Sequence, residues 1–390
     1  MYNRSYIFSQ LVSLLPRNHF DYLVKKYQAD KYLKTFSCWN HLLVLVWAQL
    51  AQRESLRDIV GSLRGHKSKF YHLGFGKNIC RSTLAVANEQ RELEVFRQMA
   101  QRILEMARVA DADLRDLYPD EIKHRVFALD STTITLEKSV FTWSHTQNKK
   151  GGVKLHTLFD LLALVPAYNI ITDHDVRDQS VMHLFPYEKN AFYIFDRAYV
   201  KLVSLHGINE REAFFVIRRK RGMSFDALEE RPLPGAHPQV MRDAKIRLSG
   251  RWARARYKEP LRIVTYYDTV RNETFDYLTN SFDLPAERIA YLYRSRWGIE
   301  LFFKWIKQHL FIKSFWGTSE NAVKIQIYSA IIAYCLVALV TRAHAPYLTT
   351  FETLRMLSVS LFEKDAIADF LAIRESPTPG DDGQMSLDLY

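Results

Sequence analysis

The chain has 390 residues, of which 48% are hydrophobic and 13% aromatic, and its formal net charge at pH 7 is +11. This composition supports large packed cores in two or three domains and excludes a disordered or low-complexity chain. The three cysteines are far apart in the sequence. Their spacing excludes a disulfide framework and a zinc site of paired cysteines, and it favours a reducing cytosol.

The positive charge is concentrated in two zones. Residues 1–80 contain 12 Lys and Arg against 4 Asp and Glu, and residues 211–258 contain 13 against 5. Such zones favour a polyanionic partner, nucleic acid above all, and a solvated charged surface is the alternative. The most apolar stretch, residues 327–340, is shorter than the roughly 20 residues of a membrane span. We therefore expect a buried core helix there, no signal peptide at the N-terminus and no membrane partner.

The first 120 residues are predicted to be helical. Short apolar-periodic segments at 6–15, 19–27, 39–51 and 56–63 precede a long amphipathic helix over residues 82–107. With the local charge, this pattern predicts a helical DNA-binding domain over residues 1–120. No helix-turn-helix register singles out a recognition helix.

From residue 123 the pattern changes to strands and then returns to helices. The predicted strands cover 124–136, 151–162, 163–172 and 191–195, with a helix at 181–189. A basic β-rich insertion over 211–285, which includes a strand at 253–257, separates this part (121–210) from a helical part (286–375). We expect one α/β domain in two pieces. Residues 376–390 are rich in Pro, Gly and Asp and predict a flexible tail.

The most informative segment is the helix predicted over residues 291–310. Five polar residues share one arc of about 80° on a continuous helix, and large apolar side chains cover the rest. An exposed helix shows the reverse proportions, so we expect a mostly buried helix whose charged stripe faces a cleft or a polyanion. A solvated ladder of i,i+4 ion pairs is the alternative. The five are Tyr293, Arg296, Glu300, Lys304 and Lys307.

Three acidic residues are candidates for a shared site. Asp130 lies inside an apolar β-run, Asp196 ends another, and Glu300 lies on the polar stripe. Buried acids are costly without a partner, although a capping or hydrogen-bonded Asp is an alternative for each one alone. Carboxylates about 4 Å apart repel by up to about 4 kcal/mol per pair, which divalent cations would relieve. Oxygen ligands without thiolates favour Mg²⁺ or Mn²⁺, and two such ions can promote phosphoryl transfer.

With these residues in place, the chain resembles the DDE transposases of bacterial insertion sequences, in the cut-and-paste branch with a Tyr-x2-Arg-x3-Glu-x6-Lys signature. The signature corresponds to Tyr293, Arg296, Glu300 and Lys307. The two aspartates match within FALDSTTITL and FDRAYV, with GGVKLH between them.

The resemblance implies an RNase H-like core with a β-strand insertion, preceded by the helical domain. It implies that Asp130, Asp196 and Glu300 bind two Mg²⁺ ions, for which Mn²⁺ substitutes. A homodimer would cleave the terminal inverted repeats and join the 3′ ends to target DNA in the bacterial cytoplasm, at the nucleoid. Two alternatives stay open: an RNase H-fold nuclease that cuts without joining, and a catalytically inactive DNA-binding derivative.

Other residues are candidate DNA contacts. Arg296 and Lys307 would hold phosphate, with Tyr293 and Lys304 beside them. Lys154 and His156 either contact DNA or are exposed to solvent, and Trp252 either stacks on an unpaired base or packs as an ordinary aromatic. Asp173, Asp175 and Asp178 rival the site acids, but turn and cap chemistry explains them. A basic run would contact phosphates: Arg218, Arg219, Lys220 and Arg221.

The C-terminus carries a further motif. Gln384, Leu387, Leu389 and Tyr390 resemble the Gln-x2-Leu-x-Leu-Phe peptide with which bacterial proteins dock on the DNA polymerase sliding clamp, with Tyr in place of Phe. A chance match in an unstructured end is the alternative.

Overall fold

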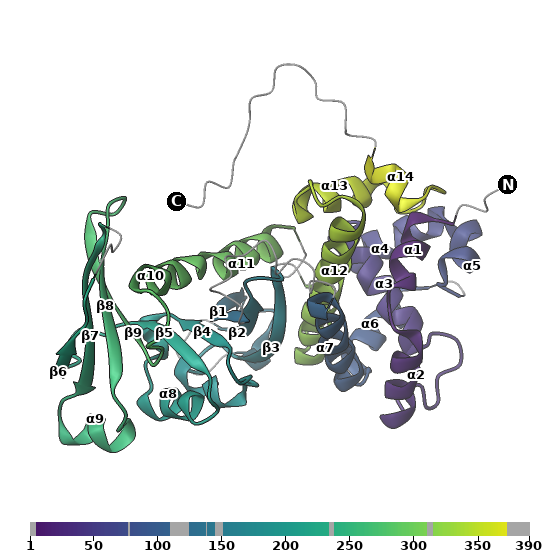
Figure 1. The fold of residues 1–390 in the computed structure, drawn as a ribbon. Helices are drawn as coiled ribbons and strands as arrows, with labels where there is room; N and C mark the ends of the chain where they lie inside the picture. Colours follow the sequence, from purple (N-terminus) through teal and green to yellow (C-terminus); the bar gives the residue numbers. More distant parts are fainter. Residues whose placement is uncertain are drawn as a thin grey trace.

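The computed structural model describes residues 5–76, 79–109, 125–137, 139–144, 151–233, 238–309 and 315–372. It has two lobes (Figure 1). One lobe is helical and combines the N-terminal helices with the last helices of the chain, and the other contains a large mixed sheet. The expected α/β class with a helical N-terminal part is confirmed.

The N-terminal helices pack around one long apolar helix, α12 (Glu320–His344), against which α3 and α7 lie. Among the described residues, α12 is the one helix long and apolar enough to cross a membrane, but 89% of its most apolar window is buried inside the protein. It is the core helix that the sequence predicted. The N-terminal helices are α1 (Ile7–Ser13), α2 (Arg17–Lys26), α3 (Cys38–Leu50), α4 (Leu56–Gly65), α5 (Phe70–Leu73), α6 (Arg81–Gln90) and α7 (Leu93–Val109).

The single helix predicted over residues 82–107 is wrong, because the chain breaks between α6 and α7. Arg91 is extended at the break (φ −67°, ψ 145°), and its buried guanidinium donates to the Phe36 carbonyl. The amide of Asn321 on α12 donates to the carbonyls of Asn88, Glu89 and Arg91. Tertiary hydrogen bonds therefore satisfy the carbonyls that the break exposes.

The sheet has nine strands in the order β3-β2-β1-β4-β5-β9-β8-β7-β6. β1, β2 and β3 form an antiparallel meander, β4 and β5 run parallel to β1, and β9 then pairs antiparallel with β5. The first five strands form the expected RNase H-like core. The strands are β1 (Val126–Leu136), β2 (Gly151–Asp160), β3 (Val165–Asp173), β4 (Phe192–Phe195), β5 (Phe214–Arg218), β6 (Phe225–Glu230), β7 (Val240–Leu248), β8 (Leu261–Asp268) and β9 (Glu273–Thr279).

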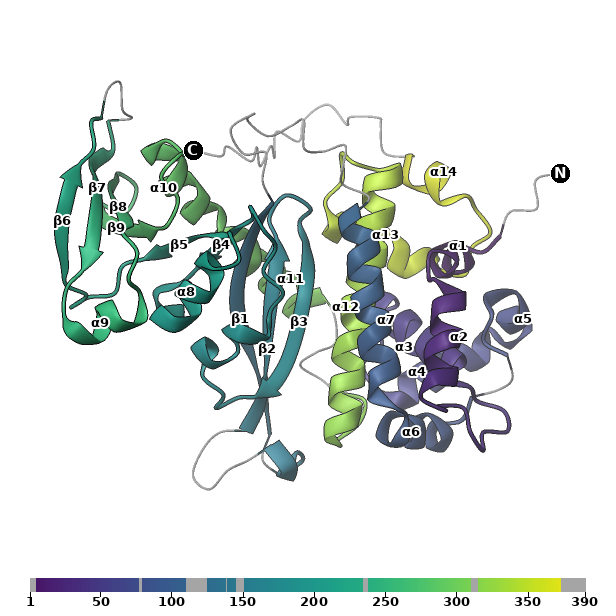
Figure 2. The same cartoon turned by 60° about the horizontal axis from the view of Figure 1, so that its bottom comes forward.

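The basic β-rich segment is continuous with this core and forms a twisted ribbon of β6–β9 at one end of the sheet (Figures 1 and 2). β5 lies inside the range predicted as insertion, yet it is hydrogen-bonded to the core strand β4. α10 (Ala286–Ser295) and α11 (Trp297–His309) lie on one face of the sheet, and α8 (Leu202–Asn209) covers the other. The core is thus a sheet between two helical layers.

Three further predictions are corrected. Residues 251–256 form the helix α9 (Arg251–Arg256) rather than a strand, and Gly250 at φ 87° turns the chain into it. Residues 181–189 form only a short 3₁₀ turn, η5 (Met182–Leu184), because Pro186 cannot continue a helix. The helical stretch predicted at 350–373 is two helices, α13 (Thr350–Ser360) and α14 (Ile367–Ala372).

Candidate active site

The first two acids are brought together by the parallel pairing of β1 with β4. Leu129 of β1 is the register partner of Phe195 of β4. Asp130 and Asp196 are the next residues along the two strands, and therefore lie at the same level of the sheet. The site is thus at the end of β4 and in the middle of β1.

The third acid comes from α11, which packs on β1. The guanidinium of Arg296 lies between two carboxylates: its Nη1 is 3.0 Å from Oδ2 of Asp130, and its Nη2 contacts Oε1 of Glu300. On the preceding helix, the hydroxyl of Tyr293 donates to Oδ1 of Asp196 over 3.4 Å. Five of the predicted residues therefore meet in one cluster, which we call the acid cluster.

The sequence predicted one continuous helix here, and this is wrong: the helix breaks at Arg296, between α10 and α11. The N–H of Arg296 bonds the carbonyl of Tyr293, three residues back, at 3.3 Å. Arg296 keeps near-helical angles (φ −50°, ψ −26°), so the polar stripe keeps its direction. A close approach follows the break, since a Cβ on Gly298 would lie 3.0 Å from Leu161. The helix is mostly buried on its other sides, as expected, although Trp297 is 54% and Leu301 46% exposed.

The charges in the acid cluster are only partly compensated. Burial raises the pKa of the Asp130 carboxyl to about 6, and the charges of Glu300 and Asp196 add to this, while the Ser131 N–H and Arg296 oppose it. The Nε of Arg296 is buried and has no hydrogen-bond partner among the described residues. The cluster therefore has more negative charge than its one guanidinium neutralises.

The donor set suits a hard divalent cation in its chemistry, since it offers carboxylate oxygens and no thiolate. Among the described residues, however, no three His, Cys, Asp or Glu side chains lie close enough together to hold an ion as they stand. The guanidinium of Arg296 lies between Asp130 and Glu300, in the space that a shared cation would take. A bound ion would thus require Arg296 to turn away from the carboxylates, toward a phosphate for instance.

A residue that sequence reasoning set aside contacts the edge of the acid cluster. Asp178, in the short turn η4 (Asp178–Ser180), accepts a hydrogen bond of 2.7 Å from the hydroxyl of Ser131, the neighbour of Asp130. Its Oδ1 is also 3.2 Å from Nζ of Lys154. The turn η4 lies against η6 (Arg197–Tyr199), which directly follows Asp196. Asp178 thus links the segments of both aspartates through tertiary contacts that no local sequence pattern indicates.

Lys154 and His156 are not exposed to solvent, so that alternative is wrong. The side chain of Lys154 is 13% exposed and bonds the Val176 carbonyl at 2.8 Å in addition to Asp178. The ring of His156 is fully buried, and this burial lowers its pKa to about 4. Asp178 already uses the charge of Lys154, so the geometry gives no direct support for a DNA contact here.

The remaining predicted residues lie farther out. Arg218 stacks on Phe275 at 4.1 Å and its charge acts on Tyr293, so it lies beside the acid cluster. Arg219 pairs with Asp276 at 2.8 Å, while Lys220, Arg221 and Lys304 are exposed and Lys307 is partly exposed.

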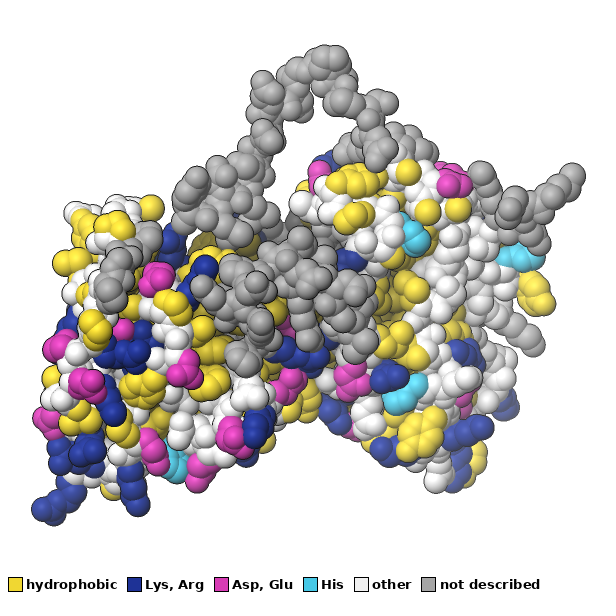
Figure 3. Space-filling model, viewed as in Figure 1, with side chains coloured by type: hydrophobic (Ala, Val, Ile, Leu, Met, Phe, Trp, Pro, Cys, Tyr) yellow, Lys and Arg dark blue, Asp and Glu magenta, His cyan; other side chains and the backbone are white. Residues whose placement is uncertain are grey.

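Trp252 lies on α9, at the lower end of the ribbon, where basic side chains gather (Figure 3). It is 64% exposed, so the packed alternative is wrong, and the guanidinium of Arg256 lies 4.0 Å above its ring. α9 packs on α8 and β7 rather than on the helices of the acid cluster.

Comparisons with known proteins identify the family of the chain. Residues 121–336 match the family "Transposase DDE domain", and residues 3–76 match a "Domain of unknown function (DUF4372)". The chain is 34% identical to a protein named as a transposase, y4zB, of Sinorhizobium fredii, over 73% of this chain and 78% of the relative. It is 31% identical to a transposase of insertion sequence IS5377 from Geobacillus stearothermophilus, over 53% of this chain and 54% of the relative.

A solved structure of the piggyBac transposase synaptic complex with hairpin DNA aligns with 96% of this chain and 81% of its own, at a TM-score of 0.42 and 9% identity. That resemblance is too distant to add to the argument. The family match spans more than half of the chain and includes all three acids. The chain therefore belongs to the DDE transposases of insertion sequences.

Proposed function

We propose that this transposase cleaves DNA at the inverted repeats of its element and joins the 3′ ends to target DNA, using Asp130, Asp196 and Glu300 as metal ligands. The observation that supports the proposal is that these acids, from two neighbouring strands and one later helix, meet around two side chains: Arg296 contacts Asp130 and Glu300, and Tyr293 contacts Asp196. The uncompensated negative charge of the acid cluster favours divalent cations.

The three carboxylates would hold two Mg²⁺ ions, and Mn²⁺ would substitute. When bound, such ions activate a water or 3′-hydroxyl and stabilise the leaving oxygen. Arg296, released from Asp130 and Glu300, would bind the scissile phosphate by its two-pronged guanidinium, and Lys307 would bind a neighbouring phosphate. Tyr293 lies against Tyr277 at 4.7 Å and keeps its hydroxyl on Asp196. Burial raises the pKa of Tyr293 to about 12, so it stays a neutral donor there.

The assembly that we propose is a homodimer on paired inverted-repeat ends, acting at the bacterial nucleoid in the cytoplasm. The helical domain and the basic ribbon would bind the ends, with Arg218 nearest to the acid cluster. Lys220, Arg221 and Lys304 are exposed and would contact flanking phosphates.

The test is cleavage of a duplex carrying the element's end, followed by strand transfer of a pre-cleaved end, each with Mg²⁺ or Mn²⁺. Wild-type protein is expected to cut and to join, and Asp130→Ala, Asp196→Ala and Glu300→Ala to do neither. Cutting without joining would support the nuclease alternative. Binding without either reaction in wild type would support the inactive derivative, and full cleavage by the three variants would refute the site.

The sliding-clamp motif at Gln384, Leu387, Leu389 and Tyr390 lies outside the described residues. We propose that it recruits the clamp and directs insertion toward replicating DNA. A tail peptide should bind purified clamp, and the double variant Leu387→Ala, Leu389→Ala should not. Equal affinity of the two peptides would contradict the proposal.

A further inference from the structure

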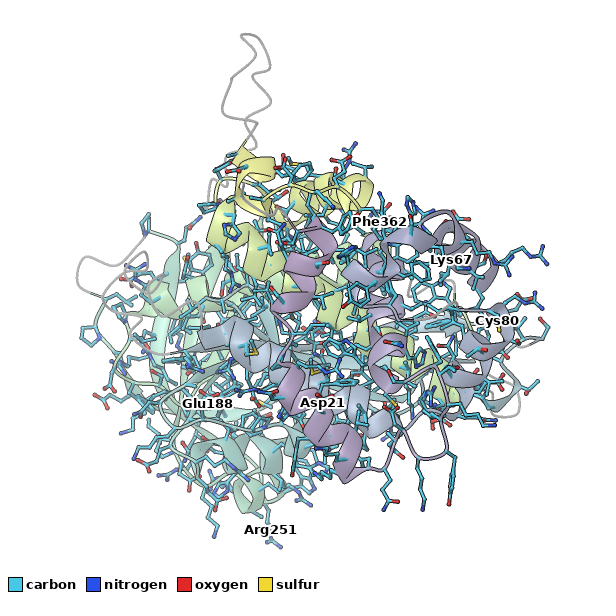
Figure 4. All side chains as sticks on the ribbon, turned by 90° about the vertical axis from the view of Figure 1, so that its right-hand side faces the viewer. Asp21, Lys67, Cys80, Glu188, Arg251 and Phe362 are labelled. Atoms are coloured by element: carbon cyan, nitrogen blue, oxygen red, sulfur yellow. The ribbon has the colours of Figure 1, made fainter. Side chains whose placement is uncertain are left out.

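The last two residues of α2 and the segment that follows them expose two apolar side chains within a group of lysines. We call residues 25–35 the lysine loop. It lies in the domain that matches a family of unknown function. Figure 2 shows it projecting beyond the end of α2, and Figure 4 shows α2, marked by Asp21, ending at the lower edge of the molecule.

The tip of the lysine loop is open to solvent. Residues 31–35 are all exposed, with Tyr32 89% and Leu33 38% exposed. Single exposed apolar residues are ordinary. These two, however, are adjacent and held at a tip by hydrogen-bonded turns: the N–H of Leu33 bonds the Asp30 carbonyl at 3.1 Å, and the N–H of Lys31 bonds the Gln28 carbonyl at 3.0 Å.

The loop is also preorganised. Gln28 and Tyr32 have φ of 50° and 65°, a left-handed conformation that costs a non-glycine residue roughly 1–2 kcal/mol. A hydrogen bond at the foot of the loop helps to hold this conformation: the carboxylate of Asp30 accepts a 2.7 Å hydrogen bond from the backbone N–H of Cys38 at the start of α3. A tip fixed in this way loses little conformational entropy on binding.

The charge of the loop has one sign on its surface. Lys25, Lys26, Lys31 and Lys34 are exposed, and Asp30, which caps Cys38, is the single acid in residues 25–35. None of the four lysines forms an ion pair with a residue that the structure describes. Lys31 instead lies 5.2 Å from the ring of Tyr32. A partner that matches such a surface has negative charges for the lysines and, between them, an apolar region for Tyr32 and Leu33.

We propose that the lysine loop docks on duplex DNA, with Tyr32 and Leu33 inserted as an apolar wedge into a groove and the lysines on the flanking phosphates. The inference rests on the proposed function, from which it takes its DNA. A bilayer of anionic lipids has the same two chemical features. DNA is favoured because the chain belongs to a transposase family and its one membrane-length described helix is buried in the core.

The test is binding of full-length protein to a fluorescent end duplex, measured by anisotropy over a range of salt concentrations. Lys31→Ala with Lys34→Ala is expected to weaken binding at low salt and to reduce the slope of log affinity against log salt by about 2, because each phosphate contact contributes about 0.9. Tyr32→Ser with Leu33→Ser is expected to weaken binding about tenfold at every salt concentration with an unchanged slope.

Tyr71→Ser is the matched control for the wedge, since Tyr71 is 88% exposed on the same domain, and Lys364→Ala is the control for the lysines. Both are expected to bind as wild type. The inference is overturned if the wedge variant binds DNA like Tyr71→Ser, or if its only loss is in flotation with phosphatidylserine vesicles. If wild-type protein binds DNA through the lysine loop but does not cut it, the proposed function is refuted and the loop proposal stands. If wild-type protein cuts DNA and the loop variants bind DNA as tightly as wild type, the loop proposal is refuted and the proposed function stands.

Discussion

Two arginines of the sheet lobe each bind carboxylates, and they do so in opposite ways. In the ribbon, Arg262 is 1% exposed, and its Nε and Nη2 donate to the two carboxylate oxygens of Asp243 over 2.8 and 2.7 Å. Its Nη1 donates to the Leu284 carbonyl over 2.6 Å. In the acid cluster, Arg296 is shared between Asp130 and Glu300, and its Nε has no hydrogen-bond partner in the part of the chain that the structure describes.

From this difference we propose that the ribbon pair is structural and the acid cluster functional. The ribbon pair is closed: every nitrogen of the guanidinium has an acceptor, and the side chains of Arg262 and Asp243 are only 1% and 5% exposed. The acid cluster is open: the side chains of Arg296 and Glu300 are 17% and 33% exposed, and its charges do not balance. The closed pair has no free hydrogen-bonding group and almost no exposed surface to offer a ligand. The open cluster is exposed to solvent and has excess negative charge, so it can accept cations and, with them, phosphate.

The largest expected effect comes from changing the open cluster. Glu300→Gln keeps the shape of the side chain and removes one carboxylate, so we expect at least about a 10³-fold loss of cleavage, or about 4 kcal/mol, with little change in thermal stability. The measurement is the single-turnover rate on end duplex. Glu320→Gln on α12 is the control, since Glu320 forms the same i,i+4 contact, with Lys324. Comparable rates for the two variants would contradict the assignment.

Breaking the closed pair should affect folding instead. Arg262→Met leaves Asp243 buried and without its bidentate partner, so we expect the free energy of unfolding to fall by about 3 kcal/mol. Urea unfolding measures this. Arg242→Met is the control, because Arg242 pairs with the exposed Glu230 and should contribute far less to the free energy of unfolding. Equal losses in the two variants would show that the ribbon pair is not structural.

The same contrast explains what the sequence could predict. Asp130, Asp196, Arg296 and Glu300 were predictable because motif spacing and hydrophobic pattern act locally, and the parallel register of β1 and β4 needs only two apolar strands. The break at Arg296 was not predictable from periodicity, because the continuous stripe is preserved through it.

Features set by distant residues were also missed. The α6–α7 break depends on Asn321, more than 200 residues away, and the role of Asp178 depends on Ser131 across the sheet. The β1–β2 register places Ser131 opposite His156, which a single sequence does not reveal. Local patterns therefore predicted which residues meet in the acid cluster, and tertiary contacts determined what surrounds them.

The open cluster should also have a pH signature. The pKa of Asp130 is about 6 in the folded protein against an ordinary 3.8, so the unfolded chain ionises first as pH rises. The free energy of unfolding therefore falls as the pH rises from 3.8 to 6, and above pH 6 the folded state carries a constant penalty of about 3 kcal/mol. In EDTA, Asp130→Asn should be more stable than wild type at pH 7.5 and equal to it at pH 4. Urea unfolding at both pH values checks this, and a difference independent of pH would contradict it.

The smallest expected effect tests whether the open cluster extends to Asp178. Asp178→Asn keeps an acceptor for Ser131 but loses the charge that holds Lys154, so we expect about a tenfold slower cleavage with unchanged DNA affinity. The half-saturating Mg²⁺ concentration should rise, because Asp130 and Asp196 are then less firmly placed. Asp175→Asn in the same loop is the control, and Ser131→Ala should give a similar loss that does not add to that of Asp178→Asn. If Asp178→Asn instead lowers only thermal stability, Asp178 has a structural role like that of the ribbon pair, and the functional part of the acid cluster does not extend to it.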